Sequence, residues 1–264
     1  MTSSPTRPST MPPTNAPRMN LVVLDMAGTT VADDGLVELA FTAAAERLGE
    51  DPAAMIDYVR ATMGESKISV FRHLLGGDET RAHQANLAFE EAYGTLVSEG
   101  RIAALPGAAG TIAALREQGR TVVLTTGFAR VTQDAVLDAL GWRDLVDLTL
   151  CPADTGGRGR PCPDMVLGAL LRTGAVDDVR RTVVAGDTSY DMLSGVRAGA
   201  GIVAGVLTGA HDEAALRRHG ATHVLASVAG LPAAIEAAEA AGGTGAGRGA
   251  ATRPPSSRPP PRPR

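Results

Sequence analysis

Short, unbroken apolar runs alternate with amphipathic stretches along most of this chain. The first run reads Leu-Val-Val-Leu-Asp at 21–25, and similar runs occupy 121–125, 182–187 and 202–207, with a weaker one at 147–150. Runs of this kind are typical of parallel strands that are covered on both faces. Helical periodicity fills the stretches between them, at 108–118, 131–140, 163–171 and 190–198. The alternation predicts an α/β fold, a Rossmann-like parallel sheet with helices on both faces.

Residues 35–104 interrupt this alternation, because they contain only helical patterns. The predicted helices cover about 36–48, 53–63, 66–75 and 79–96, and glycines separate them. The block follows the first strand directly, so it leaves the sheet at the carboxyl edge, where α/β sheets bind ligands. We therefore expect an inserted all-helical cap at 35–104, able to close over a site, and a core domain formed by 20–34 and 105–240.

Composition narrows the class of protein. The chain has 264 residues, 44% of them apolar, which excludes disorder throughout. No apolar run reaches the ~18 residues that span a bilayer, and no secretory signal is visible. Only two cysteines, Cys151 and Cys162, are present, which fits a reducing compartment and predicts a cytoplasmic protein.

The two ends of the chain differ from the rest in charge. Residues 1–19 and 241–264 are rich in proline and hold seven arginines and no acidic residue, whereas the whole chain carries a net charge of −4. Such segments bury too little apolar surface to fold, so we expect both to be disordered tails. They are either solvated or contact an acidic partner or nucleic acid. The acidic body between them argues against a nucleic-acid-binding domain.

Polar residues at the ends of the predicted strands are the candidates for chemistry. Asp25 ends the first strand and precedes Gly28, so its carboxylate lies at the mouth of the sheet. A carboxylate there can attack phosphorus or hold a metal ion. Thr125 and Thr126 end another strand, followed by Gly127. Their hydroxyl and N–H groups suit a phosphate oxygen, although the same residues also suit an ordinary strand-to-helix turn.

Two further segments add opposite charges. Arg160 precedes a predicted helix and could neutralise both a carboxylate and a phosphoryl group, or lie on the surface. Asp187 and Asp191 stand four residues apart, at a strand end and in the first turn of a helix. Carboxylates so placed can converge on Mg²⁺. A helix N-cap would explain one of them but not both.

In this order, the four segments resemble those of the haloacid dehalogenase-like hydrolase superfamily, over about residues 20–240. The resemblance implies that Asp25 is the nucleophile that accepts a phosphoryl group. It implies that Mg²⁺ is held by Asp25, the Ala27 carbonyl and Asp187, with Asp191 in support. Binding of the phosphoryl group is assigned to Thr125, Thr126, Gly127 and Arg160.

One position separates branches of this superfamily. Its phosphatases usually carry a second Asp two residues after the nucleophile, as general acid and base, and here Ala27 stands there. Without that acid an alkoxide leaving group has no obvious proton donor. Asp-x-Ala-Gly-Thr-Thr instead looks like the phosphonatase branch, phosphonoacetaldehyde hydrolase.

The phosphonatase branch also uses a lysine in a Met-Gly-x-x-Lys-Ile setting, and this chain reads Met-Gly-Glu-Ser-Lys-Ile from Met63 to Ile68. Lys67 is the only lysine in the chain. An amine can condense with an aldehyde to an iminium, which accepts the electrons of a breaking C–P bond, and arginine cannot. The resemblance therefore implies an imine at Lys67, with Met63 near the substrate. As a residue taken alone, Lys67 could equally be a solvated helix position.

Two positions depart from this branch. It often has His three residues after the lysine, where Val70 stands, and Tyr where Phe128 stands. His73 does not replace the missing His, because it lies about 120° away around the helix. A homodimer through the cap is implied by the resemblance alone.

These observations predict an Mg²⁺-dependent hydrolase that cleaves the C–P bond of phosphonoacetaldehyde or a close analogue. The first alternative is a phosphatase for a small phosphorylated metabolite, of the phosphoglycolate phosphatase type. A second is a phospho-acceptor signalling module with a stable aspartyl phosphate. Such modules are about 120 residues long and need no helical cap.

Overall fold

A six-stranded parallel sheet forms the centre of the computed structural model, which describes residues 18–244. The strand order is β3-β2-β1-β4-β5-β6. The strands are β1 (Leu21–Asp25), β2 (Thr121–Thr125), β3 (Leu148–Leu150), β4 (Thr182–Gly186), β5 (Ile202–Val206) and β6 (His223–Leu225). Asp25 pairs in register with Thr125, and Leu24 pairs with Ala185. The ends of β1, β2 and β4 therefore meet at one edge of the sheet.

Helices cover both faces of this sheet, so the predicted α/β class is confirmed. Val22 and Leu24 pack in one apolar cluster with Ile112 of α5 and Ile235 of α10, whereas Leu21 and Val23 pack in another, with residues of α7. The covering helices are α5 (Ala108–Glu117), α7 (Asp164–Thr173), α8 (Ser189–Ala198), α9 (Glu213–Arg218) and α10 (Leu231–Thr244). Burial on both sides explains why β1 and β4 are apolar at nearly every position.

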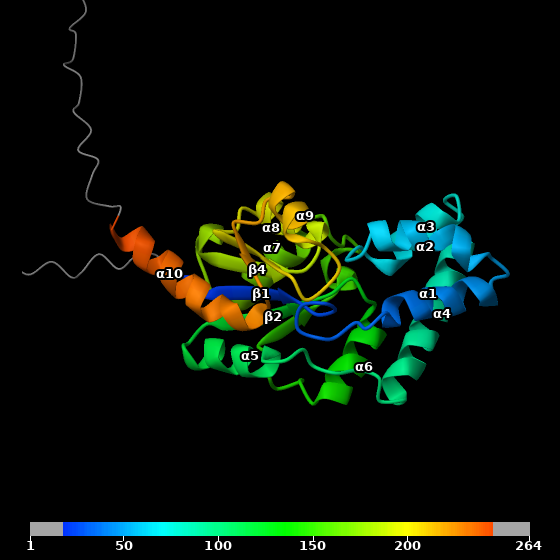
Figure 1. Ribbon diagram of the computed structural model, residues 1–264, viewed down its shortest axis with the longest axis horizontal. Helices are drawn as coiled ribbons and strands as arrows, with labels where there is room; N and C mark the ends of the chain where they lie inside the picture. The colour runs from blue at the N-terminus through cyan, green and yellow to red at the C-terminus, as the bar shows by residue number, and fades with distance from the viewer. Residues whose placement is uncertain (1–17, 245–264) are drawn as a thin grey trace, which may run out of the picture.

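Of the five helices between β1 and β2, the first four group together at one end of the sheet (Figure 1). We call them the insert: α1 (Leu36–Arg47), α2 (Pro52–Ala61), α3 (Lys67–Leu74) and α4 (Glu79–Ser98). Aromatic rings hold the insert together, with Phe41 and Phe71 at 4.7 Å and Phe41 and Phe89 at 4.9 Å between centroids. Helix α6 (Arg130–Leu140), which follows β2, contacts α4 of the insert.

The described residues extend a short way into both predicted tails. The Met19 N–H donates to Glu239 Oε1 at 2.6 Å, and Arg181 Nε donates to the Arg18 carbonyl at 2.9 Å. Helix α10 continues through Thr244. The rest of the two predicted tails lies outside the described residues. Across residues 18–244, no helix has the length and apolar character needed to cross a membrane.

Candidate active site

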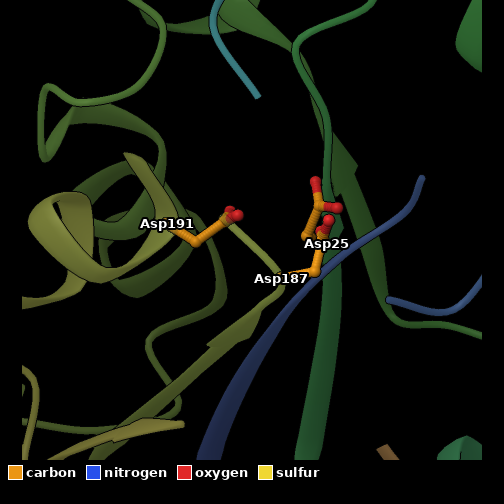
Figure 2. A group of neighbouring side chains, drawn as sticks. All are labelled: Asp25, Asp187 and Asp191. Atoms are coloured by element: carbon orange, nitrogen blue, oxygen red, sulfur yellow. The ribbon is translucent and has the colours of Figure 1, made fainter. Parts of the chain in front are cut away.

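Three carboxylates meet at the carboxyl edge of the sheet. Asp25 ends β1, Asp187 directly follows β4, and Asp191 reaches towards them from the first turn of α8 (Figure 2). One oxygen from each lies within 4.8 Å of the others. All three side chains are buried, with exposed fractions between 1% and 6%. Residues far apart in the sequence thus form one compact oxygen-rich centre.

This centre carries more negative charge than its surroundings balance. Burial raises the pKa of Asp25 well above its usual value, and burial together with the Asp191 charge raises the pKa of Asp187 to about 7. Among residues 18–244 a single guanidinium, Arg160, contacts the cluster, so full ionisation of all three carboxylates would leave two negative charges uncompensated. A divalent cation would cancel them, and oxygen ligands are those that Mg²⁺ prefers. The residues present therefore fit the metal ion that the sequence predicts.

Arg160 bridges two of these acids. Its Nη1 lies 2.8 Å from Asp25 Oδ1, and its Nε lies 2.7 Å from Asp191 Oδ1. Its Nη2 donates to Thr125 Oγ1 at 2.6 Å. Within residues 18–244, Nη1 is buried and its contact with Asp25 is an ion pair that does not meet hydrogen-bond geometry; a phosphoryl oxygen beside Asp25 could therefore accept from it. Arg160 is 4% exposed, which excludes the surface alternative.

The N-cap of α8 is Thr188 rather than either aspartate, and Asp191 completes a capping box with it. Its Oδ2 accepts hydrogen bonds from the Thr188 N–H at 3.1 Å and from Thr188 Oγ1 at 2.5 Å. The other oxygen, Oδ1, faces Arg160. The N-cap interpretation is therefore wrong for both aspartates, and Asp191 stabilises the start of α8 with one carboxylate oxygen while the other faces the site.

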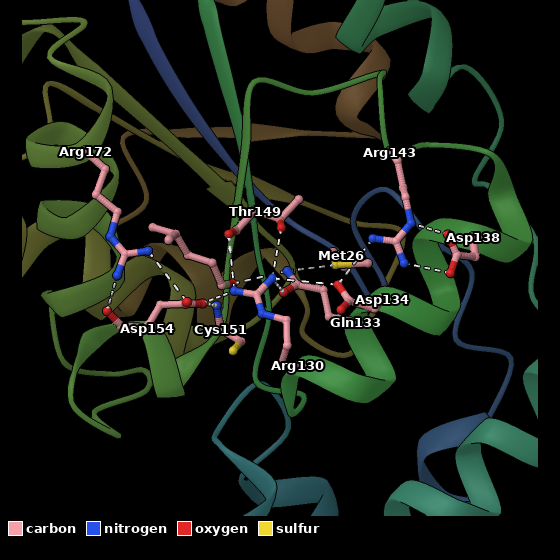
Figure 3. Close-up of polar contacts among 11 residues, drawn as sticks. Met26, Arg130, Gln133, Asp134, Asp138, Arg143, Thr149, Cys151, Asp154 and Arg172 are labelled. Atoms are coloured by element: carbon pink, nitrogen blue, oxygen red, sulfur yellow. Dashed lines mark hydrogen bonds and ion pairs between the residues drawn. The ribbon is translucent and has the colours of Figure 1, made fainter.

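A polar network fixes the segment that carries Arg160. Arg130, at the start of α6, donates to Thr149 Oγ1 at 3.1 Å and pairs with Asp154 (Figure 3). Asp154 also accepts from the Cys151 N–H at 2.8 Å, and its carbonyl accepts from Arg172 at 2.6 Å. The loop after β3 is thus tied to α6 and α7 shortly before it reaches Arg160.

Thr126 and Gly127, which follow Thr125 in the turn after β2, contact backbone groups rather than the charged residues of the site. Thr126 Oγ1 accepts a hydrogen bond from the Phe128 N–H at 3.2 Å, and the Thr126 N–H donates to the Leu150 carbonyl. Gly127 lies against the insert, where a Cβ would come within 2.6 Å of the Glu65 carbonyl oxygen. Of the three predicted phosphate-binding residues in this turn, only Thr125 contacts a charged group of the site through its side chain.

Lys67 begins α3, a helix of the insert, and its side chain is buried between α1 and the turn after β2, with 6% of its surface exposed. Its Nζ lies 5.8 Å from the centre of the Phe41 ring and 5.4 Å from that of Phe128. Among the described residues, Nζ takes part in no hydrogen bond and no ion pair. Burial lowers the pKa of Lys67 to about 8, against the opposing attraction of Asp33 and then of Asp25. At pH 7 about a tenth of this amine is therefore uncharged, and the uncharged form is the one that acts as a nucleophile.

A cleft of about 460 Å³ opens beside the carboxylates. Met63 of the insert lines it together with Ala27, Gly28 and Asp187, so the structure brings these predicted residues to one cavity. Lys67 lines a separate hollow of about 160 Å³ with Gly127 and Phe128. The loop between α2 and α3 contributes Met63 to the cleft and Ser66 to the hollow. At this loop a Cβ on Gly64 would come within 2.5 Å of Thr188 Oγ1, so the insert is seated tightly on the sheet.

Comparison with known families agrees with this geometry. A family model described as haloacid dehalogenase-like hydrolase matches residues 19–199. The chain belongs to this family of hydrolases. A relative named probable phosphatase IndB, from Dickeya dadantii, is 31% identical over 72% of this chain and 82% of its own. A phosphonoacetaldehyde hydrolase from Bacteroides fragilis is 29% identical over 79% of this chain and 82% of its own.

Solved structures agree on the fold. The crystal structure of a phosphonoacetaldehyde hydrolase-like protein from Oleispira antarctica matches with a TM-score of 0.75 and 23% identity, over 88% of this chain and 96% of that one. At that identity the likeness establishes the family's fold and no more. The activity must be argued from the side chains.

Several residues at the site were not predicted from the sequence. Asp33, which exerts the largest electrostatic effect on Lys67, belongs to the loop after β1 and also accepts the Val37 N–H at 3.1 Å. Thr29 donates to Asp187 Oδ1 at 3.1 Å. Their positions after a strand end were a usable signal, because that edge of the sheet binds ligands. His73 stacks on Tyr58 at 4.1 Å.

Proposed function

We propose that this hydrolase cleaves the C–P bond of phosphonoacetaldehyde or a close analogue, with Asp25 as phosphoryl acceptor and Lys67 as imine-forming amine. The observation that carries the proposal is the buried amine of Lys67, with its pKa lowered to about 8. No other lysine exists in the chain to perform this step. The similarity to the phosphonoacetaldehyde hydrolase of Bacteroides fragilis supports the same conclusion.

In the proposed reaction, the neutral Lys67 amine adds to the aldehyde and loses water to give an iminium. An Asp25 carboxylate oxygen then forms a bond to phosphorus while the C–P bond breaks. The C–P electron pair moves onto the iminium and gives an enamine. Protonation of the enamine carbon and hydrolysis release acetaldehyde and regenerate Lys67. Water cleaves the aspartyl phosphate, which returns Asp25 and releases phosphate.

Charge placement supports the phosphoryl step. Arg160 pairs with Asp25 through Nη1, so its guanidinium lies where it can neutralise the equatorial oxygens of the transferring group. Asp25, Asp187 and the Ala27 carbonyl would hold Mg²⁺, with Asp191 in support. When bound, this ion supplies positive charge that reduces repulsion between the carboxylate and the phosphoryl group.

A phosphatase for small phosphorylated metabolites is the second candidate. It is supported by the similarity to the relative named probable phosphatase IndB. The side chain of Ala27 opposes it, because it cannot donate a proton to an alkoxide leaving group.

Both candidates are tested by measuring phosphate release from phosphonoacetaldehyde, phosphoglycolate and p-nitrophenyl phosphate. The proposal predicts cleavage of the phosphonate by the wild type and none by Lys67→Arg. Borohydride added with aldehyde should attach mass at Lys67 in the wild type. It should do so also in Asp25→Asn, which keeps the amine and loses the nucleophile. Phosphomonoester turnover that survives Lys67→Arg, with no phosphonate cleavage by the wild type, would replace the first candidate by the second.

Four broader expectations remain proposals. They are the division into a core domain (20–34 and 105–240) and a cap (35–104), the cytoplasmic location, a homodimer, and a small phosphonate or phosphate metabolite as the partner.

A further inference from the structure

The segment from Thr208 to His211 begins two residues after the end of β5 (Ile202–Val206) and forms hydrogen bonds with three separate parts of the site. At one end, Thr208 Oγ1 donates to the Gly28 carbonyl at 2.7 Å. At the other end, His211 Nδ1 accepts the Ser189 N–H at 2.7 Å. Between these anchors, the Ala210 N–H donates to Asp187 Oδ2 at 2.8 Å. No residue of this segment belongs to the predicted site.

The backbone of this segment lies directly on the Asp187 carboxylate. A Cβ on Gly209 would come within 2.0 Å of Asp187 Oδ2, so only glycine permits the approach. On the opposite side, Thr29 Oγ1 donates to Asp187 Oδ1 at 3.1 Å. The two carboxylate oxygens are thus held by different donors, which fixes the rotation of the group. A carboxylate oxygen that accepts a hydrogen bond still has a lone pair for a further partner.

The imidazole of His211 links this segment to a second acid. Ser189 is the first residue of α8, and Asp191 lies in the same helical turn. Because Nδ1 accepts a backbone N–H, the ring must be neutral, with its proton on Nε2. The same ring therefore fixes the loop over Asp187 and the start of the helix that presents Asp191.

We propose that Thr208–His211 is a clasp that positions Asp187 for the metal ion, with Thr208 and His211 as its anchors. Donors that orient a ligating carboxylate commonly change metal affinity by 10–100-fold when they are removed. The inference rests on the Mg²⁺ site of the proposed function. It assigns a positioning role, through Asp187, to a segment whose residues 208–210 also line the cleft beside the carboxylates.

The decisive comparison uses two substitutions at His211. In His211→Asn, the amide Oδ1 occupies nearly the same place as Nδ1 and can still accept the Ser189 N–H. In His211→Leu, a methyl group stands there. The purified full-length chain is titrated with Mg²⁺ by calorimetry, without substrate, and each variant's Tm is recorded. We expect Leu to weaken Mg²⁺ binding by about tenfold or more, and Asn to stay within about threefold of the wild type.

A variant at the other anchor and a remote control complete the design. Thr208→Val removes the hydroxyl bond to Gly28 and should also weaken Mg²⁺ binding, which keeps the test decisive if His211→Leu does not fold. His83→Leu changes an exposed histidine of α4 and should leave the affinity unchanged.

The possible failures are distinguishable. If the wild type binds Mg²⁺ and the Leu and Val variants bind it equally well, the clasp is wrong and the proposed function stands. If Asn weakens binding as much as Leu, the acceptor role of His211 is overturned. If the wild type binds no Mg²⁺, the metal site of the proposed function fails, and the clasp fails with it.

Discussion

Replacing Lys67 with methionine should stabilise the protein while it abolishes the proposed imine. The ammonium lies near two aromatic rings and forms no ion pair among the described residues, and burial lowers the pKa of Lys67 from 10.5 to about 8. That difference corresponds to about 3 kcal/mol, the free energy that a charged Lys67 costs the folded state at pH 7. Methionine is an unbranched, flexible and apolar side chain, so it can fill the space without that cost.

The pH dependence gives this prediction a distinctive form. The pKa of Lys67 is lower in the folded chain than in the unfolded one, so the unfolded chain binds more protons between pH 8 and pH 10.5. Over this interval the wild type gains stability relative to Lys67→Met. The advantage of the variant should therefore be full at pH 7, fall from about pH 8, and vanish near pH 10.5. Groups that titrate identically in both proteins cancel in the difference.

Urea unfolding followed by circular dichroism at pH 7, 8.5 and 10 measures the free energy of unfolding of both proteins. Lys67→Arg is the matched control, because arginine stays charged at every pH used. The destabilisation that its buried charge causes should therefore not decrease between pH 7 and pH 10. The reasoning is refuted if Lys67→Met is no more stable than the wild type at pH 7. It is refuted also if the stability difference does not change with pH.

Three further predictions concern the site. In Asp33→Asn, loss of the carboxylate that raises the pKa of Lys67 should move the midpoint of the pH–rate profile to lower pH; an unchanged midpoint would contradict this. In Arg160→Lys, one ammonium replaces a fork that reaches Asp25 and Asp191 together, so kcat should fall by about 100-fold, and phosphate release at a wild-type rate would exclude the bridging role. Dialysis against EDTA should remove activity and Mg²⁺ should restore it, because Arg160 can balance only one of the three carboxylates when all are ionised; full activity of the metal-free protein would disprove a catalytic cation.

The sheet and its acids could be predicted because their signals are local. A parallel strand buried on both faces must be apolar at nearly every position, so β1 and β4 are visible in the sequence, and Asp25 and Asp187 stand at or just after their ends. Because the carboxyl ends of parallel strands lie at one edge of the sheet, the proximity of these two acids could also be predicted. The predicted bounds of β1 and β2 match the observed ones, whereas most helices differ by a residue or two at one end or both, since helix ends fray.

Other features depend on contacts that no local pattern reveals. Strand β6 spans only His223–Leu225 and is half-buried, so it lacks a long apolar run. The surroundings of Lys67 combine Phe41 from α1 with Phe128 from the turn after β2, which only the packed insert brings together. His211 forms no ligand spacing with other histidines, and its role arises from a single hydrogen bond across two elements.

The tight seat of the loop between α2 and α3 links the position of the lysine to that of the whole insert. The Lys67 N–H donates to the Gly127 carbonyl at 3.4 Å, and Gly64 lies against Thr188. Lifting these helices from the sheet would withdraw the single lysine of the chain from the acid at the end of β1 in the same movement. In the proposed reaction, one hinge motion would therefore admit solvent to the site and separate the Lys67 amine from Asp25 at the same time.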